Sequence, residues 1–163
     1  MKLKNKGQAL VEFALVAFVL FSILFAIIDL AMMFYVNLTM QHAVRAGTRY
    51  AVTGQTLTGN STPADRLAAM IQTIRNNSNG LYDKNLNSPK DPVVSIIHPG
   101  GVSYANYTGT PQSGTTGNPN DIIVVRLTYK WQLLTPLLKP FLPNGIYTFT
   151  VKSTMKNEQF PTS

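Results

Sequence analysis

The chain opens with a long apolar run, and shorter stretches of periodic hydrophobicity follow it. Residues 8–28 carry a single ionisable side chain, Glu12. Counted from Ala9, the run has about twenty positions, which at about 1.5 Å per residue matches a bilayer core of about 30 Å. A secretory signal peptide is the alternative, but its apolar stretch is typically about 7–15 residues and ends in a small-x-small site. Neither feature fits, so we expect a membrane-spanning helix over about residues 9–28.

This helix is expected to continue past the membrane. Asp29 ends the uncharged run as an interfacial carboxylate, yet no Gly or Pro follows until Gly47. The predicted helix therefore runs from residue 8 to about residue 53, on the order of 70 Å. The lysines within residues 2–6 place the N-terminus in the cytoplasm by the positive-inside rule, and the rest of the chain outside.

The remainder, residues 54–163, is predicted to form an extracytoplasmic α+β domain. Turn-forming residues at 54–62 end the long helix, and Thr62 and Pro63 are suited to cap and begin a second one. Its apolar residues recur at helical spacing; they are Leu67, Met70, Ile71 and Ile74. Residues 99–121 are rich in Gly, Ser, Thr, Pro and Asn, which indicates a flexible exposed loop.

Three stretches have the pattern of β-strands. They are the apolar run 93–97 and the alternating stretches 123–131 and 147–151. A Pro-punctuated connection that ends in Asn144-Gly145 joins the last two. The predicted fold class is α+β: a long N-terminal membrane-spanning helix, a second short helix and a small, mainly antiparallel sheet of about three strands.

The amino-acid composition says more about which chemical functions are excluded than about the fold. The 163 residues suit one domain, and the absence of Cys excludes disulfides, thiolate metal sites and a cysteine nucleophile. His42 and His98 are the only histidines, and no spacing supplies further ligands beside them, so we expect no metal site. No catalytic set of residues stands out in the sequence. We therefore also expect no cofactor and no small-molecule substrate. The net charge of +7 falls once the three lysines within residues 2–6 are set aside, and no basic patch in the remaining sequence indicates nucleic-acid binding.

Several residues of the long helix allow two interpretations. Arg45 and Arg49 could bind phosphate or a partner's carboxylates, or form a solvated stripe. Ala43, Ala46 and Gly47 could admit a second helix closely or pack against the sheet.

Glu12 is the residue on which the functional interpretation depends. A charge near the middle of a bilayer costs about 2.5–3.5 kcal/mol, so a carboxylate at this position needs compensation or an interfacial location. Gly7-Gln8-Ala9-Leu10-Val11-Glu12, after a basic leader and before an apolar run, resembles the class III signal of type IV pilin-like precursors. The resemblance implies that prepilin peptidase cuts between Gly7 and Gln8, removing residues 1–7. Glu12 would then pair with the new amine of a neighbouring subunit as an assembly contact.

The longer pattern narrows the resemblance to one family. Several segments are similar to the TadE-like family of tight-adherence (Tad/Flp) pilus pseudopilins. They are Gln-Ala-Leu-Val-Glu-Phe-Ala-Leu, the segment 35–54, Tyr129-x-Trp131 and the stretches 134–138 and 153–158. Ordinary type IV pilins usually have Phe-Thr-Leu-x-Glu after the cut, which this chain lacks. The resemblance implies a minor pilin or pseudopilin, not an enzyme, that works in pilus biogenesis and adhesion.

The partners implied are the membrane, prepilin peptidase, other pilin-like subunits or copies of the chain, and a pilus assembly platform. The implied location is the inner or cytoplasmic membrane, single pass, or an extracellular pilus. Two alternatives stay open: a single-pass anchored binding domain that is not polymerised, and the main subunit of its own pilus-like filament. An exported enzyme is a more distant alternative.

Overall fold

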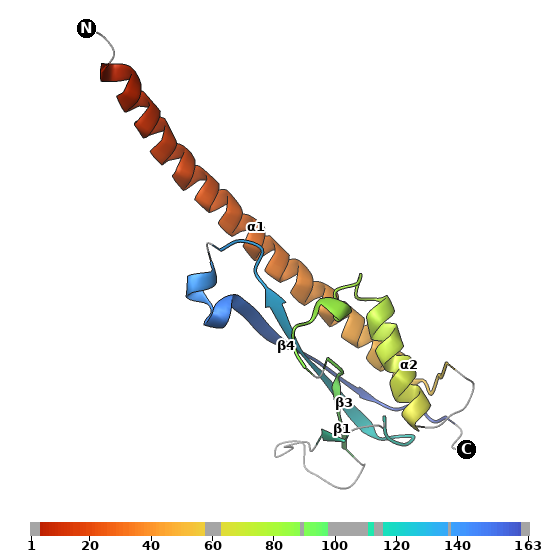
Figure 1. The fold of residues 1–163 in the computed structure, drawn as a ribbon. Helices are drawn as coiled ribbons and strands as arrows, with labels where there is room; N and C mark the ends of the chain where they lie inside the picture. Colours follow the sequence, from red (N-terminus) through yellow and green to blue (C-terminus); the bar gives the residue numbers. More distant parts are fainter. Residues whose placement is uncertain are drawn as a thin grey trace. The chain divides into compact units, whose positions relative to one another are not determined.

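The computed structural model describes residues 4–57, 63–88, 90–97, 111–112, 116–136 and 138–160. Its order of elements is α1 (Lys4–Val52), α2 (Pro63–Asn76), β1 (Val93–Ile97), β2 (Pro111–Gln112), β3 (Ile122–Gln132) and β4 (Ile146–Lys156), as Figure 1 shows. Single 3₁₀ turns cover Tyr82–Lys84, Lys139–Phe141 and Pro143–Gly145. The predicted fold class is confirmed.

Two compact units make up the chain. One contains Met1–Tyr35 and Gln132–Tyr147, and the other contains Val36–Trp131 and Thr148–Ser163. The hydrophobic core with helix α2 and most of the sheet belongs to the second unit, whereas the apolar start of α1 belongs to the first.

Helix α1 changes character along its length. Its side chains from Gly7 to Ile28 are exposed or only partly covered, whereas one stripe is buried from Asp29 onward. Within the second unit the stripe consists of Val36, Met40, Ala43, Val44, Gly47, Thr48, Ala51 and Val52. Their spacing of three, four and seven residues is that of one helix face, so this part of α1 is amphipathic and belongs to the core.

Helix α2 packs closely on α1 at Gly47. A Cβ atom at this position would lie 2.4 Å from Ile74 Cγ1 and 2.9 Å from the Met70 carbonyl oxygen, which leaves no room for a side chain. Met70 and Ile74 are buried, but Leu67 and Ile71 of the predicted stripe are partly exposed. Gly47 therefore admits a second helix, which is one of the two interpretations that the sequence left open.

The sheet has the strand order β2-β1-β3-β4. Strand β1 is antiparallel to β3, with Ser95 opposite Val124, and antiparallel to the two-residue β2. Thr128 contacts Thr150 and the ring of Tyr129 contacts that of Phe149, so β3 and β4 also run in opposite directions. The alternation of the sequence appears as alternating burial along β3 and β4.

Asn85 extends the pairing of β3 beyond the end of β1. Its side chain donates to the Thr128 carbonyl oxygen at 3.1 Å and accepts from the Lys130 amide at 2.9 Å. The Leu86 amide then donates to the Lys130 carbonyl oxygen. Asn85 is buried, and its amide group supplies the hydrogen bonds of a strand neighbour.

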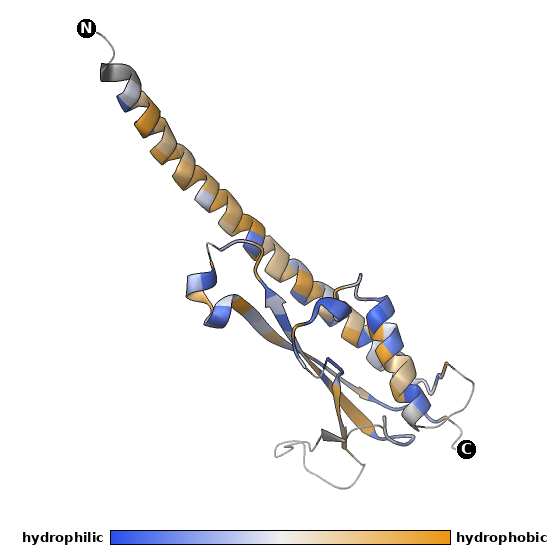
Figure 2. Cartoon of the chain, in the orientation of Figure 1, coloured by the Kyte–Doolittle hydropathy of each residue, from blue (hydrophilic) through white to orange (hydrophobic). Residues whose placement is uncertain are grey.

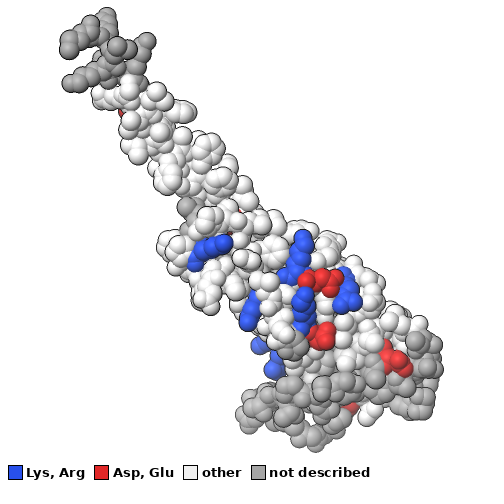
Figure 3. Space-filling view, in the orientation of Figure 1, with Lys and Arg blue, Asp and Glu red and all other residues white. Residues whose placement is uncertain are grey.

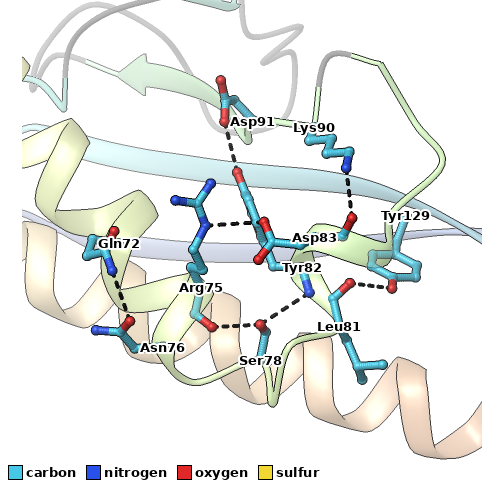
Figure 4. Close-up of polar contacts among 10 residues, drawn as sticks. All are labelled: Gln72, Arg75, Asn76, Ser78, Leu81, Tyr82, Asp83, Lys90, Asp91 and Tyr129. Atoms are coloured by element: carbon cyan, nitrogen blue, oxygen red, sulfur yellow. Dashed lines mark hydrogen bonds and ion pairs between the residues drawn. The ribbon is translucent and has the colours of Figure 1, made fainter.

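Polar contacts hold the connection between α2 and β1, as Figure 4 shows. Tyr82 donates to Asp91 at 2.8 Å, and Arg75 pairs with Asp83 at 3.3 Å. The hydroxyl of Tyr129 donates to the Leu81 carbonyl oxygen at 2.6 Å. Burial raises the pKa of Tyr129 to about 12, and burial together with the Asp91 hydrogen bond raises the pKa of Tyr82 still further.

Some predictions fall outside the described residues. They concern Lys2, Thr62, His98 and most of the loop at 99–121. The Asn-Gly turn is described: Asn144 and Gly145 both adopt positive φ, 53° and 66°, as such a turn requires.

Candidate functional site

The candidate site is the N-terminal stretch of α1, which contains the predicted processing and assembly residues. Gly7, Gln8 and Glu12 are exposed in this helix. Gln8 and Glu12 are four residues apart and so lie on one helix face. Among the described residues Glu12 has no hydrogen bond or ion pair, so its carboxylate is free to meet a group from outside.

Large apolar side chains surround this carboxylate and continue along the helix. Those exposed are Leu10, Val11, Phe13, Leu15, Val16, Phe18, Val19, Leu20, Phe21, Ile23, Leu24, Phe25, Ile27 and Ile28. Figure 2 shows the same stretch mostly orange, and in Figure 3 it is almost uniformly white. An exposed apolar surface of this extent indicates a membrane or protein contact. In the part of the chain that the structure describes, α1 is the one helix long and apolar enough to cross a membrane.

Asp29 ends this apolar stretch, and its carboxylate is only 1% exposed. One carboxylate oxygen accepts from the Thr135 amide at 3.3 Å, and the other accepts from the Thr135 hydroxyl. Asp29 is thus a contact within the chain, between α1 and the β3–β4 connection. The sequence predicted a carboxylate at the interface but could not predict this partner, since 106 residues separate the two.

His42, Arg45 and Arg49 lie on an exposed face of α1 in the second unit. With Tyr50 and Met155 they line an open groove of about 510 Å³. Neither arginine has a charged partner among the described residues. No group of three or more metal-ligating side chains exists in the described part of the chain, so nothing there completes a metal site around His42.

Comparison with known families assigns the helix that carries these residues. Residues 7–49 match the family model described as TadE-like protein. This helix is TadE-like. The match begins at Gly7 and covers most of α1, whereas α2 and the sheet lie outside it. No curated protein and no solved structure matches the chain.

The TadE-like match indicates a pseudopilin associated with a Tad pilus. Members of this family are structural pilus proteins and not enzymes. The match and the single apolar helix together indicate membrane anchoring and association with other pilus subunits.

Proposed function

We propose that the chain is a minor pilin or pseudopilin of a Tad/Flp-type pilus. In this proposal prepilin peptidase cuts after Gly7 on the cytoplasmic side, and the TadE-like helix then carries the subunit from the membrane into the filament. The folded domain after the membrane span lies outside, where it serves pilus biogenesis and adhesion.

One observation carries the proposal: a helix whose apolar side chains are mostly exposed has a single carboxylate near its start. Glu12 is the fifth residue after Gly7, and from Gln8 to Ile28 it is the only ionisable side chain. A simple membrane anchor gains nothing from a carboxylate at this place, because burying the charge costs free energy. A helix that must pack against the helix of a neighbouring subunit in one register gains a specific contact from the carboxylate.

The cut supplies the opposite charge. Cleavage between Gly7 and Gln8 leaves an ammonium group on Gln8, four residues from Glu12 along the helix. In an apolar bundle of helices, the Glu12 carboxylate of one subunit pairs with the Gln8 ammonium of the next. Because an unpaired charge in such surroundings costs several kcal/mol, the pair permits one register and excludes others.

The local structure around the cut suits proteolysis. The Gly7–Gln8 bond lies in the first turns of α1, and no atom of the described residues lies within 4 Å of the position of a Cβ atom on Gly7. Glycine lowers the stability of a helix by about 0.5–1 kcal/mol relative to alanine, which favours opening of this turn in the peptidase.

The first experiment determines the N-terminus of the mature protein. The protein is isolated from its native membrane and from the sheared surface fraction, and intact mass and N-terminal peptides are measured. We expect the mature chain to begin at Gln8. Retention of Met1 to Lys6 in the mature protein would reject processing and favour the single-pass anchored domain. Abundance in the sheared fraction separates a minor subunit from the main subunit of a filament.

The second experiment tests the assembly contact. Glu12→Gln keeps the size of the side chain but removes its charge, and Glu12→Asp is the matched control that keeps the charge. A lost charge-assisted hydrogen bond of about 1.5–3 kcal/mol predicts that incorporation of Glu12→Gln into pili falls by about tenfold or more. Its expression and processing should be unchanged. Normal incorporation of Glu12→Gln would contradict the proposed pairing.

A further inference from the structure

The connection between β3 and β4 is apolar and exposed to an unusual degree. Between Gln132 and Tyr147 the only charged residue is Lys139. Leu134 is 59% exposed and Phe141 is 83% exposed, although both side chains are large and apolar. Exposed apolar side chains indicate a contact when they belong to one continuous apolar surface, so the surface next to this connection matters.

This connection shares a groove with the apolar part of α1, and both belong to the same unit. Phe18, Phe21 and Phe25 line the groove from the helix, and Leu134 and Pro136 line it from the connection. Its volume is about 630 Å³. The three phenylalanines lie four to eleven residues before Asp29, which is about 6–16 Å along the helix axis. Leu134 and Pro136 therefore lie beside the part of α1 that is long and apolar enough to span a membrane.

Several polar groups of the connection are satisfied within the chain or are missing from the backbone. Pro136, Pro140 and Pro143 have no backbone N–H to satisfy. The amides of Phe141, Leu142 and Gly145 donate to carbonyl oxygens within the 3₁₀ turns. The amide and hydroxyl of Thr135 donate to Asp29, which satisfies both groups and the carboxylate. Non-helical backbone enters the membrane region only when its polar groups are satisfied in this way.

We propose that the described residues of this connection, 134–136 and 138–141, form a second membrane contact, which enters the boundary between headgroups and acyl chains on the side of the membrane where α1 emerges. The acyl chains cover Leu134, Phe141 and the groove beside the phenylalanines of α1. Lys139 keeps its ammonium at the level of the lipid phosphates, as lysines at membrane interfaces do. The inference rests on insertion of α1 into the membrane, and not on cleavage or polymerisation.

The absence of native cysteines permits a direct test with single-cysteine variants of the full chain. Leu134→Cys and Phe141→Cys, both at exposed positions, are labelled with the environment-sensitive fluorophore NBD. Phe21→Cys reports insertion of α1, and Leu86→Cys, 51% exposed in the other unit, is the matched control. Each protein is reconstituted into phosphatidylcholine–phosphatidylglycerol vesicles that contain a lipid with a nitroxide near the headgroup end of its acyl chain.

We expect the nitroxide lipid to quench the labels at positions 134 and 141 severalfold, and to leave the label at position 86 unaffected. If position 141 behaves like position 86 while position 21 is buried in lipid, the connection lies in water and the inference is wrong. If position 21 is also in water, insertion of α1 fails, and the proposed function fails with it. A third outcome is that the label at position 141 is protected from aqueous iodide but is not quenched by the nitroxide lipid. If this protection also increases with the protein-to-lipid ratio, a second copy of the chain covers the connection, and the proposed lipid contact is wrong.

Discussion

A single methyl group at Gly47 tests how α1 and α2 pack. The new Cβ atom of Gly47→Ala would lie 2.4 Å from Ile74 Cγ1 and 2.9 Å from the Met70 carbonyl oxygen. Carbon atoms in favourable contact are about 3.5–4.0 Å apart, so both neighbours must move. The Ile74 side chain can rotate, but the Met70 oxygen is part of the backbone and moves only if α2 shifts. We predict that Gly47→Ala lowers the free energy of unfolding.

Two opposing effects determine the magnitude. Replacing a glycine by alanine inside a helix gains about 1 kcal/mol of helix propensity. Overpacking a close contact costs about 1–3 kcal/mol, and the upper part of this range applies where backbone must move. The expected result is a net destabilisation of about 1 to 2 kcal/mol.

The assay is denaturant unfolding of the full chain in detergent, followed by the fluorescence of Trp131. This residue is the only tryptophan and is buried in β3, in the same unit as Gly47. Ala46→Gly is the control for helix propensity, because it makes the reverse change one position away. Ile74→Ala on the Gly47→Ala background should remove part of the clash. A Gly47→Ala protein at least as stable as the wild type would refute the reasoning.

Two further predictions concern the polar contacts. Thr135→Val removes the hydroxyl that donates to Asp29, and the loss of such a hydrogen bond costs about 1.5–3 kcal/mol. Amide hydrogen exchange in the β3–β4 connection should therefore be roughly ten- to hundredfold faster, whereas the control Thr135→Ser keeps the donor. Unchanged exchange in Thr135→Val would show that the hydroxyl contributes nothing. Tyr129 has a pKa of about 12 in the folded protein and about 10 when unfolded, so its contribution to stability is complete below about pH 10 and is lost as the pH rises to about 12. Tyr129→Phe should therefore make the unfolding midpoint less dependent on pH between these values, and an unchanged slope would count against burial as the cause.

Local signals in the sequence predict most of the fold. The run without charges predicts the apolar part of α1, a short apolar run predicts β1, and alternation predicts β3 and β4, because these patterns depend on neighbours only a few positions apart. The start of α2 at Pro63 and the Asn144-Gly145 turn also follow from local backbone preferences. The match at residues 7–49 confirms the expected TadE-like resemblance within α1, and the roles of Gly7, Gln8 and Glu12 stay predictions.

Contacts between distant residues could not be predicted in this way. Arg66 would be expected on the polar face of α2, yet it is buried, with its guanidinium 4.2 Å from the centre of the Phe160 ring and a hydrogen bond to the Gly117 carbonyl oxygen. Burial lowers the pKa of Arg66, and the nearby Asp121 opposes this effect. Thr135 beside Asp29 and Asn85 beside β3 are of the same kind. Each of these contacts joins residues that are far apart in the sequence, and such a pair produces no periodic pattern from which it could be predicted.

The change of burial along α1 has a mechanical consequence. The exposed apolar residues and the residues that complete the core belong to one helix, with no glycine or proline between Gly7 and Gly47. A tension applied at the N-terminal end of α1 is therefore carried along the backbone of this helix toward the side chains around Val36 and Met40. Traction on the helix during extraction from a membrane would load the hydrophobic core itself, so the strength of the α1–α2 contact at Gly47 helps to set the force that the subunit withstands.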